Sequence, residues 1–85
     1  MYKRQEDYID DCVRIVKELV VDEEFSDEIW YALTAEIMDT CLFIGGDFGE
    51  ENIQNITNQY ITSNGIARFK KAHGVRSVSY THLIF

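Results

Sequence analysis

The amino-acid sequence predicts an all-α protein, a small bundle of about four helices. Apolar residues recur at the three- and four-residue spacing of helical faces, and cap-forming residues divide the chain into four such segments. The 85 residues allow one domain, and 46% of them are apolar, which favours a folded chain over a disordered one. A chain of this length buries only about 60% of its unfolded surface, so its core is marginal unless copies associate.

The first helix is expected over residues 6–21, before the acidic sequence 22–24 interrupts its pattern. Charged residues occupy one side of this segment, and the opposite side is apolar. The residues expected to face the core are Ile9, Cys12, Val13, Val16 and Val20.

The second helix is expected to begin after Ser26 and to run to about Ile44. Ser26 is a typical N-cap, and Asp27 and Glu28 follow it in the first turn, where the helix dipole favours negative charge. Apolar residues cover more than one stripe of this helix, so it is expected to be central or to face another subunit. The apolar excess therefore predicts a homodimer or higher oligomer. The sequence Gly45-Gly46 is expected to end the helix.

The third helix is expected to open at a variant of the capping box, in which Asp47 precedes Glu50 by three residues. The fourth is expected over residues 65–73, with Asn64 as its N-cap and Gly74 ending it. The residues expected to face the core are Ile53, Ile56, Tyr60 and Ile61 in the third helix, and Ile66 and Phe69 in the fourth.

The two ends of the chain resemble a sequence of another origin. Residues 2–5 read YKRQ and residues 78–83 read VSYTHL. Both resemble pieces of one translated linker, VSYTHLDVYKRQ, which recurs at the ends of reading frames in assembled metagenomes. The resemblance implies a frame read from environmental DNA, and it leaves open whether that frame is complete. We therefore expect a single domain over residues 6–76, flanked by linker-derived ends at 1–5 and 77–85.

Charge is divided unevenly along the chain. All 15 acidic residues lie within residues 1–51, which carry a net charge of −11, whereas residues 52–85 carry +4. Acidic helix faces are usually solvated surfaces, but an extended one attracts a basic protein surface through long-range electrostatic steering. The carboxylates proposed to form such a partner-binding surface are Asp7, Asp10, Asp11, Glu18, Glu36 and Asp39.

Trp30 and Tyr31 are candidates for an interface. Because they are adjacent on a helix, they cannot both point into one core, and one of them is expected at a rim or interface. The alternative is that Trp30 packs in the core and Tyr31 lies flat across a neighbouring helix.

The basic residues near the C-terminus allow two further interpretations. The turn between the third and fourth helices, residues 62–65, resembles that of a helix-turn-helix motif, with residues 65–73 as the recognition helix for DNA. The negative charge of the domain opposes DNA binding. Alternatively, cations from several subunits line a pocket for a small anionic nucleotide signal. A third explanation needs no ligand: basic residues near the C-terminus of a helix interact favourably with the helix dipole, or they pair with the acidic half of the chain. The residues concerned are Arg68, Lys70, Lys71 and His73.

Cys12 and Cys41 are expected to be buried free thiols. In an antiparallel hairpin that turns near residue 23, they are offset by about 9 Å along the helix axis, more than a disulfide allows. Free thiols suit a reducing cytoplasm, where we expect the protein. No metal site and no cofactor are expected, because the cysteines and His73 lack paired ligand spacing.

No catalytic motif is present, so an enzyme is not expected. The turn at residues 45–49 resembles a phosphate cradle, but the three carboxylates at 47, 50 and 51 would repel a phosphate. The longest apolar run is four residues, too short to span a membrane, and no signal peptide is visible.

These observations favour a small, cytoplasmic, non-catalytic binding protein. Its size, acidity and environmental origin fit a phage or mobile-element protein that inhibits a host component, such as an anti-CRISPR or other anti-defence protein. An acidic helical surface would dock on a basic surface of the host protein. The DNA-binding regulator and the oligomeric sponge for an anionic signal remain as alternatives.

Overall fold

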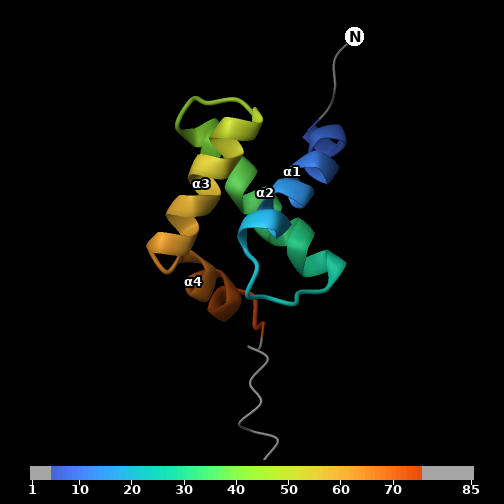
Figure 1. Ribbon diagram of the computed structural model, residues 1–85, viewed down its shortest axis with the longest axis vertical. Helices are drawn as coiled ribbons and strands as arrows, with labels where there is room; N and C mark the ends of the chain where they lie inside the picture. Colours follow the sequence, from blue (N-terminus) through green and yellow to red (C-terminus); the bar gives the residue numbers. More distant parts are fainter. Residues whose placement is uncertain (1–4, 76–85) are drawn as a thin grey trace, which may run out of the picture.

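The computed structural model describes residues 5–75, which form four α-helices and, within that range, no strand. Helices α1, α2 and α3 pack against one another, and α4 packs against α3 beyond its C-terminal end (Figure 1). This arrangement confirms the predicted small all-α bundle. Of the ends that resemble a linker, residues 1–4 and 77–85 lie outside the described part, and Gln5 is the first residue of α1. The helix bounds are α1 Gln5–Leu19, α2 Asp27–Phe43, α3 Glu50–Thr62 and α4 Gly65–Ala72.

The apolar face of α1 lies in the core as the spacing predicts. Cys12, Val13 and Val16 are buried, and Ile9 is half-buried against the same cluster. The helix ends at Leu19, two residues earlier than expected: the N–H of Val20 still donates to the carbonyl of Val16, and the chain then turns at residues 21–22. Val21 is consequently exposed.

Helix α2 is the main source of the core. Ser26 caps its N-terminus as expected, accepting a hydrogen bond from the N–H of Ile29. The apolar residues that exceed one stripe lie in the last turn and beyond it, where Leu42, Phe43 and Ile44 are exposed. Helix α2 is therefore central, and most of its apolar surface is used within the chain. Its buried residues are Trp30, Leu33, Thr34, Ile37, Met38 and Cys41.

A glycine ends α2 as the sequence predicts. Gly45 adopts φ +82°, the left-handed conformation that a side chain disfavours. The N–H of Gly46 donates to the carbonyl of Cys41 at 2.8 Å, and that of Gly45 donates to Leu42 at 3.0 Å. This pair of bonds is a Schellman motif, which satisfies carbonyls that the helix end would leave without partners.

The predicted capping box at the start of α3 is wrong. Gly49 occupies the N-cap position, and Asp47 lies two residues before it. The Asp47 carboxylate instead accepts hydrogen bonds from the N–H of Gly49 at 2.9 Å and from the amide of Asn52 at 2.8 Å. Aspartate readily forms such a turn with the backbone two residues ahead, which here delays the helix until Glu50.

The buried face of α3 differs from the prediction at one position. Ile53 and Ile56 are buried as expected, but Ile61 is 40% exposed and Thr57 is buried in its place. The buried positions 53, 56 and 57 follow three- and four-residue steps, and position 61 lies past the edge of that face. The hydroxyl of Thr57 is satisfied by donating to the carbonyl of Ile53.

Helix α4 begins where Asn64 and Gly65 reverse the chain. Asn64 is at the N-cap as predicted, but it adopts φ +62° and its side chain makes no capping bond. Gly65 is buried, and a Cβ atom there would lie 3.0 Å from the Cα of Tyr60. This close approach explains why glycine suits the position. Ile66 and Phe69 face the core as expected.

Thr34 leads to a stability prediction. It is fully buried in α2, and its hydroxyl has no hydrogen-bond partner among the described residues. Thr34→Val replaces that hydroxyl with a methyl group of similar size, so we expect it to raise the free energy of unfolding by about 1 kcal/mol. Urea denaturation followed by circular dichroism measures the change.

Thr57→Val is the matched control, because Thr57 is equally buried but hydrogen-bonded. This variant should be neutral or destabilising. Equal effects of the two substitutions would contradict the assignment of Thr34 as an unsatisfied buried hydroxyl.

Candidate functional site

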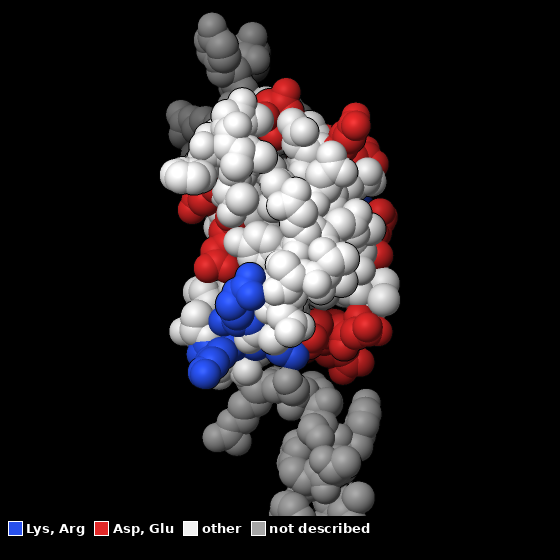
Figure 2. All heavy atoms as spheres, turned by 90° about the vertical axis from the view of Figure 1, so that its left-hand side faces the viewer, with Lys and Arg blue, Asp and Glu red and all other residues white. Residues whose placement is uncertain are grey.

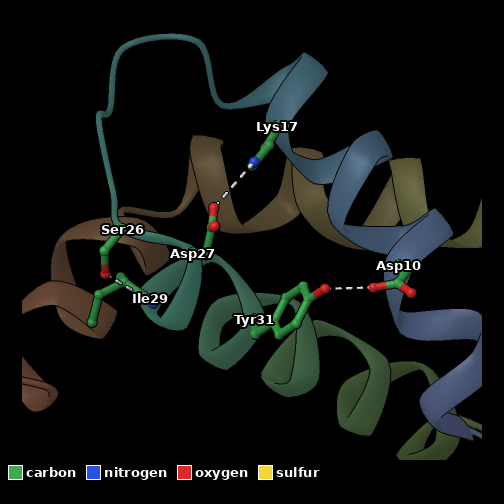
Figure 3. A network of polar contacts seen from close by, with 6 residues as sticks. All are labelled: Asp10, Lys17, Ser26, Asp27, Ile29 and Tyr31. Atoms are coloured by element: carbon green, nitrogen blue, oxygen red, sulfur yellow. Dashed lines mark hydrogen bonds and ion pairs between the residues drawn. The ribbon is translucent and has the colours of Figure 1, made fainter.

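The structure brings together one aromatic residue of the proposed interface and one carboxylate of the proposed acidic surface. The hydroxyl of Tyr31 on α2 donates a hydrogen bond to the carboxylate of Asp10 on α1 (Figure 3). Lys17 of α1 and Asp27 of α2 form a second bridge between the same helices, with nitrogen and oxygen 3.8 Å apart. We call these four residues the Tyr31 edge.

The Tyr31 edge is accessible and negatively charged. Tyr31 is 44% exposed, and the other three residues of the edge are also exposed. The hydrogen bond to Asp10 is the main cause of a raised pKa for Tyr31, and the negative charges of Asp10 and Asp27 add to it. The phenol therefore stays protonated and keeps its donor at neutral pH.

Trp30 lies inside the protein. Only 6% of it is exposed, and its ring packs against that of Phe25 with centroids 4.8 Å apart. The ammonium group of Lys17 lies 5.8 Å from the centre of the indole. Of the two aromatic residues proposed for an interface, Tyr31 is therefore the one that a partner could contact.

The six carboxylates proposed as one acidic surface do not all lie together. Asp7, Asp11 and Glu18 are exposed on α1 with Asp10, although Arg14 lies 3.7 Å from Asp11 and reduces the local charge. Asp39 is exposed on α2, about two turns beyond Tyr31.

Glu36 is separate from the α1 carboxylates. It is half-buried and lines a groove of about 430 Å³ formed by α2, α3 and α4. Its carboxylate lies 3.8 Å from the imidazole of His73 on α4. Of the other five members of the acidic set, four lie on α1 and Asp39 lies on α2, and Asp10 is the member that belongs to the Tyr31 edge.

The basic residues of α4 are largely engaged within the chain. The ammonium of Lys70 lies 2.9 Å from the carboxylate of Glu23, and both side chains are mostly buried. His73 stacks against Phe69 with ring centroids 4.4 Å apart. The guanidinium of Arg68 donates to the carbonyl of Ser63 at 2.9 Å, and Lys71 is exposed.

These contacts bear on the two anion-binding interpretations. The groove includes Arg68, but it also includes Glu36, and neither Lys70 nor Lys71 is among its lining residues. The pairing of Lys70 with Glu23 joins the basic and acidic halves of one chain. The sequence predicts that a basic residue could pair with the acidic half, but it does not identify Glu23 as the partner of Lys70. The two residues are 47 positions apart, and no local pattern links them.

Cys12 and Cys41 are buried and free, as expected. Burial is the main cause that raises the pKa of Cys12 to about 11, and the neighbouring Cys41 contributes. Burial also raises the pKa of Cys41. Within residues 5–75, no group of three or more His, Cys, Asp or Glu side chains is placed to hold a metal ion.

Comparison of the chain with protein-family models, with curated proteins and with solved structures gives no match. In the part of the chain that the structure describes, no helix is both long enough and apolar enough to cross a bilayer. The structure therefore defines the class as a small all-α protein. The features that bear on its function are its exposed surfaces.

The hydrogen bond between Tyr31 and Asp10 is expected to depend on pH. Because the pKa of Tyr31 is raised above its ordinary value near 10, its interaction with Asp10 is fully present below that pH and is lost as pH rises through the raised pKa. Asp10→Asn should move the Tyr31 titration back toward the ordinary value. Ultraviolet absorbance of tyrosinate measures it, and subtraction of the Tyr31→Phe titration isolates this residue. An unchanged titration in Asp10→Asn would show that the two groups are not in contact.

Proposed function

We propose that this chain is a small, non-catalytic binding protein of a phage or mobile element that inhibits a host defence protein. The Tyr31 edge docks on a basic surface of that protein. The observation that carries the proposal is the exposed ring of Tyr31, held by Asp10 and flanked by Asp27. The resemblance of the chain's ends to a metagenomic linker supports the environmental origin.

The chemistry of the edge suits arginine on the partner. The face of a guanidinium group stacks on an aromatic ring, while the N–H groups at its edge pair with carboxylates. One arginine can therefore engage Tyr31 and Asp10 together. Tyrosine is among the residues that contribute most to protein interfaces. Because the hydroxyl of Tyr31 is already bonded to Asp10, less side-chain freedom is lost on binding.

The charge of the whole molecule supports the same partner. A net charge of −7 on 85 residues creates a field that speeds encounter with a positive surface. It also opposes approach to nucleic acid. The contacts of Lys70 with Glu23 and of His73 with Glu36 make the DNA-binding and anion-sponge alternatives weaker, because these two side chains already face carboxylates.

A comparison of variants tests the proposal. The immobilised chain is exposed to lysate from candidate host bacteria, and captured proteins are identified by mass spectrometry. Asp10→Lys or Tyr31→Ala should lower capture of the specific partner at least tenfold, because each removes a central contact of the edge. Capture should also weaken as salt is raised.

Glu24→Lys is the control for charge, since Glu24 is exposed in the loop before α2 and the substitution changes the net charge as much as Asp10→Lys does. It should leave most of the binding intact. Equal loss in Asp10→Lys and Glu24→Lys would indicate unspecific charge attraction, and undiminished capture by Tyr31→Ala would exclude the Tyr31 edge.

A further inference from the structure

We propose that the outer face of α3 is a self-association surface, on which a second copy of this chain packs its own α3 in antiparallel orientation about a two-fold axis. The α3 face consists of Glu51, Asn55, Asn58 and Thr62. Their spacing of four, three and four residues puts them on one side of the helix, and all four are exposed. The inference is independent of the Tyr31 edge, which lies on α1 and α2.

The first support is the absence of charge. Residues 52–67 contain no Asp, Glu, Lys or Arg, although these residues make up 27% of the chain. Figure 2 shows the consequence: uncharged atoms fill the middle of this side, with acidic atoms at its upper end and along its rims, and with basic atoms at its lower end beside a further acidic cluster. Depletion of charged residues is one part of the compositional signal of an interface core. Two copies that each carry −7 also repel each other least where neither presents a charge.

The second support is the charge at the two ends of the face. Glu50 and Glu51 are exposed in the first turn of α3. At the other end, Arg68 lies at the groove and donates to the carbonyl of Ser63, the C-cap residue of α3, and Lys71 is exposed one turn further along α4. The face therefore runs from acidic through uncharged to basic.

This order makes the face complementary to itself in one orientation. In an antiparallel pair, the acidic end of each copy meets the basic end of the other, so the two-fold axis forms the contact twice. A parallel pair would instead place acids against acids and bases against bases. The 13 residues of α3 span about 20 Å, which separates the two charged ends enough for both contacts to form.

The middle of the pair is formed by amides. The centre of the face lies between Asn55 and Asn58, so the two-fold axis brings Asn55 of one copy toward Asn58 of the other. Each amide group carries both donors and an acceptor, so two copies can bond to each other without any change of side chain. The oligomer predicted from the sequence was assigned to α2, whose apolar residues are mostly used in the core. We assign it to α3.

A charge exchange tests the arrangement. Sedimentation equilibrium at low salt should show a monomer–dimer equilibrium for the chain. Glu51→Lys and Lys71→Glu should each raise the dimer dissociation constant roughly tenfold, because each alters two symmetry-related contacts. The double variant carrying both substitutions should return it close to the original value. Asn58→Glu should abolish the dimer by placing two carboxylates near the axis.

Glu28→Lys, on α2, gives the same change of net charge as Glu51→Lys and should not weaken the dimer. Circular dichroism checks that every variant is folded. A chain that is monomeric at all concentrations would overturn the proposal and leave the α3 face to another protein. Equal effects of Glu28→Lys and Glu51→Lys, or failure of the double variant to recover the dimer, would overturn the antiparallel pairing.

Discussion

Burial of the apolar side of α2 is the constraint on which the rest of this structure depends. Leu33, Ile37 and Met38 have no exposed surface, and α1 and α3 supply the residues that cover them. Each fully buried side chain of this kind contributes about 1.5 to 3 kcal/mol to folding. In a chain of 85 residues few other sources of stability exist, so the positions of α1 and α3 follow from the need to cover α2.

The placement of charge follows from that core. Because α1 covers α2 along one edge, Asp10 reaches Tyr31 and Lys17 reaches Asp27. Because α4 folds back beyond the end of α3, Lys70 reaches Glu23 in the loop between α1 and α2. The acidic and basic halves of the sequence are thus joined at one end of the bundle, while the other carboxylates are spread over α1, α2, the loop between them and the start of α3.

Local patterns in the sequence predicted the helices well, because each has an apolar stripe and a recognisable cap. Ser26 caps α2, and Gly45 and Gly74 adopt the left-handed conformation at helix ends, as their chemistry favours. The error at Asp47 arose because an aspartate can cap a helix or close a turn before it, and sequence spacing does not separate the two. The apolar excess of α2 predicts a helix that is central or faces another subunit; the helix is central, and the oligomer stays a prediction.

The candidate sites were less predictable, since they join residues far apart in the chain. Asp10 is predicted from the acidic side of the first helix and Tyr31 from its position next to Trp30, but their contact depends on the path of the loop over residues 20–26. Glu36 was grouped with the α1 carboxylates, yet the rotation of α2 turns it toward His73 and the groove. The exposed, uncharged side of α3 is visible in the sequence as a run without charged residues. That it ends near Arg68 and Lys71 depends on how α4 packs against α3, which the sequence does not show.

Photo-crosslinking identifies the surface that the Tyr31 edge contacts. Arg14→p-benzoylphenylalanine, at an exposed position beside Asp10 and Lys17, is compared with the same replacement at Val21, which is 74% exposed but lies outside the edge. If the edge docks on a basic surface, position 14 crosslinks to one host protein, at a segment rich in arginine or lysine, and position 21 does not. Crosslinks to the same protein from both positions, or a crosslinked segment that is acidic or apolar, would contradict this docking.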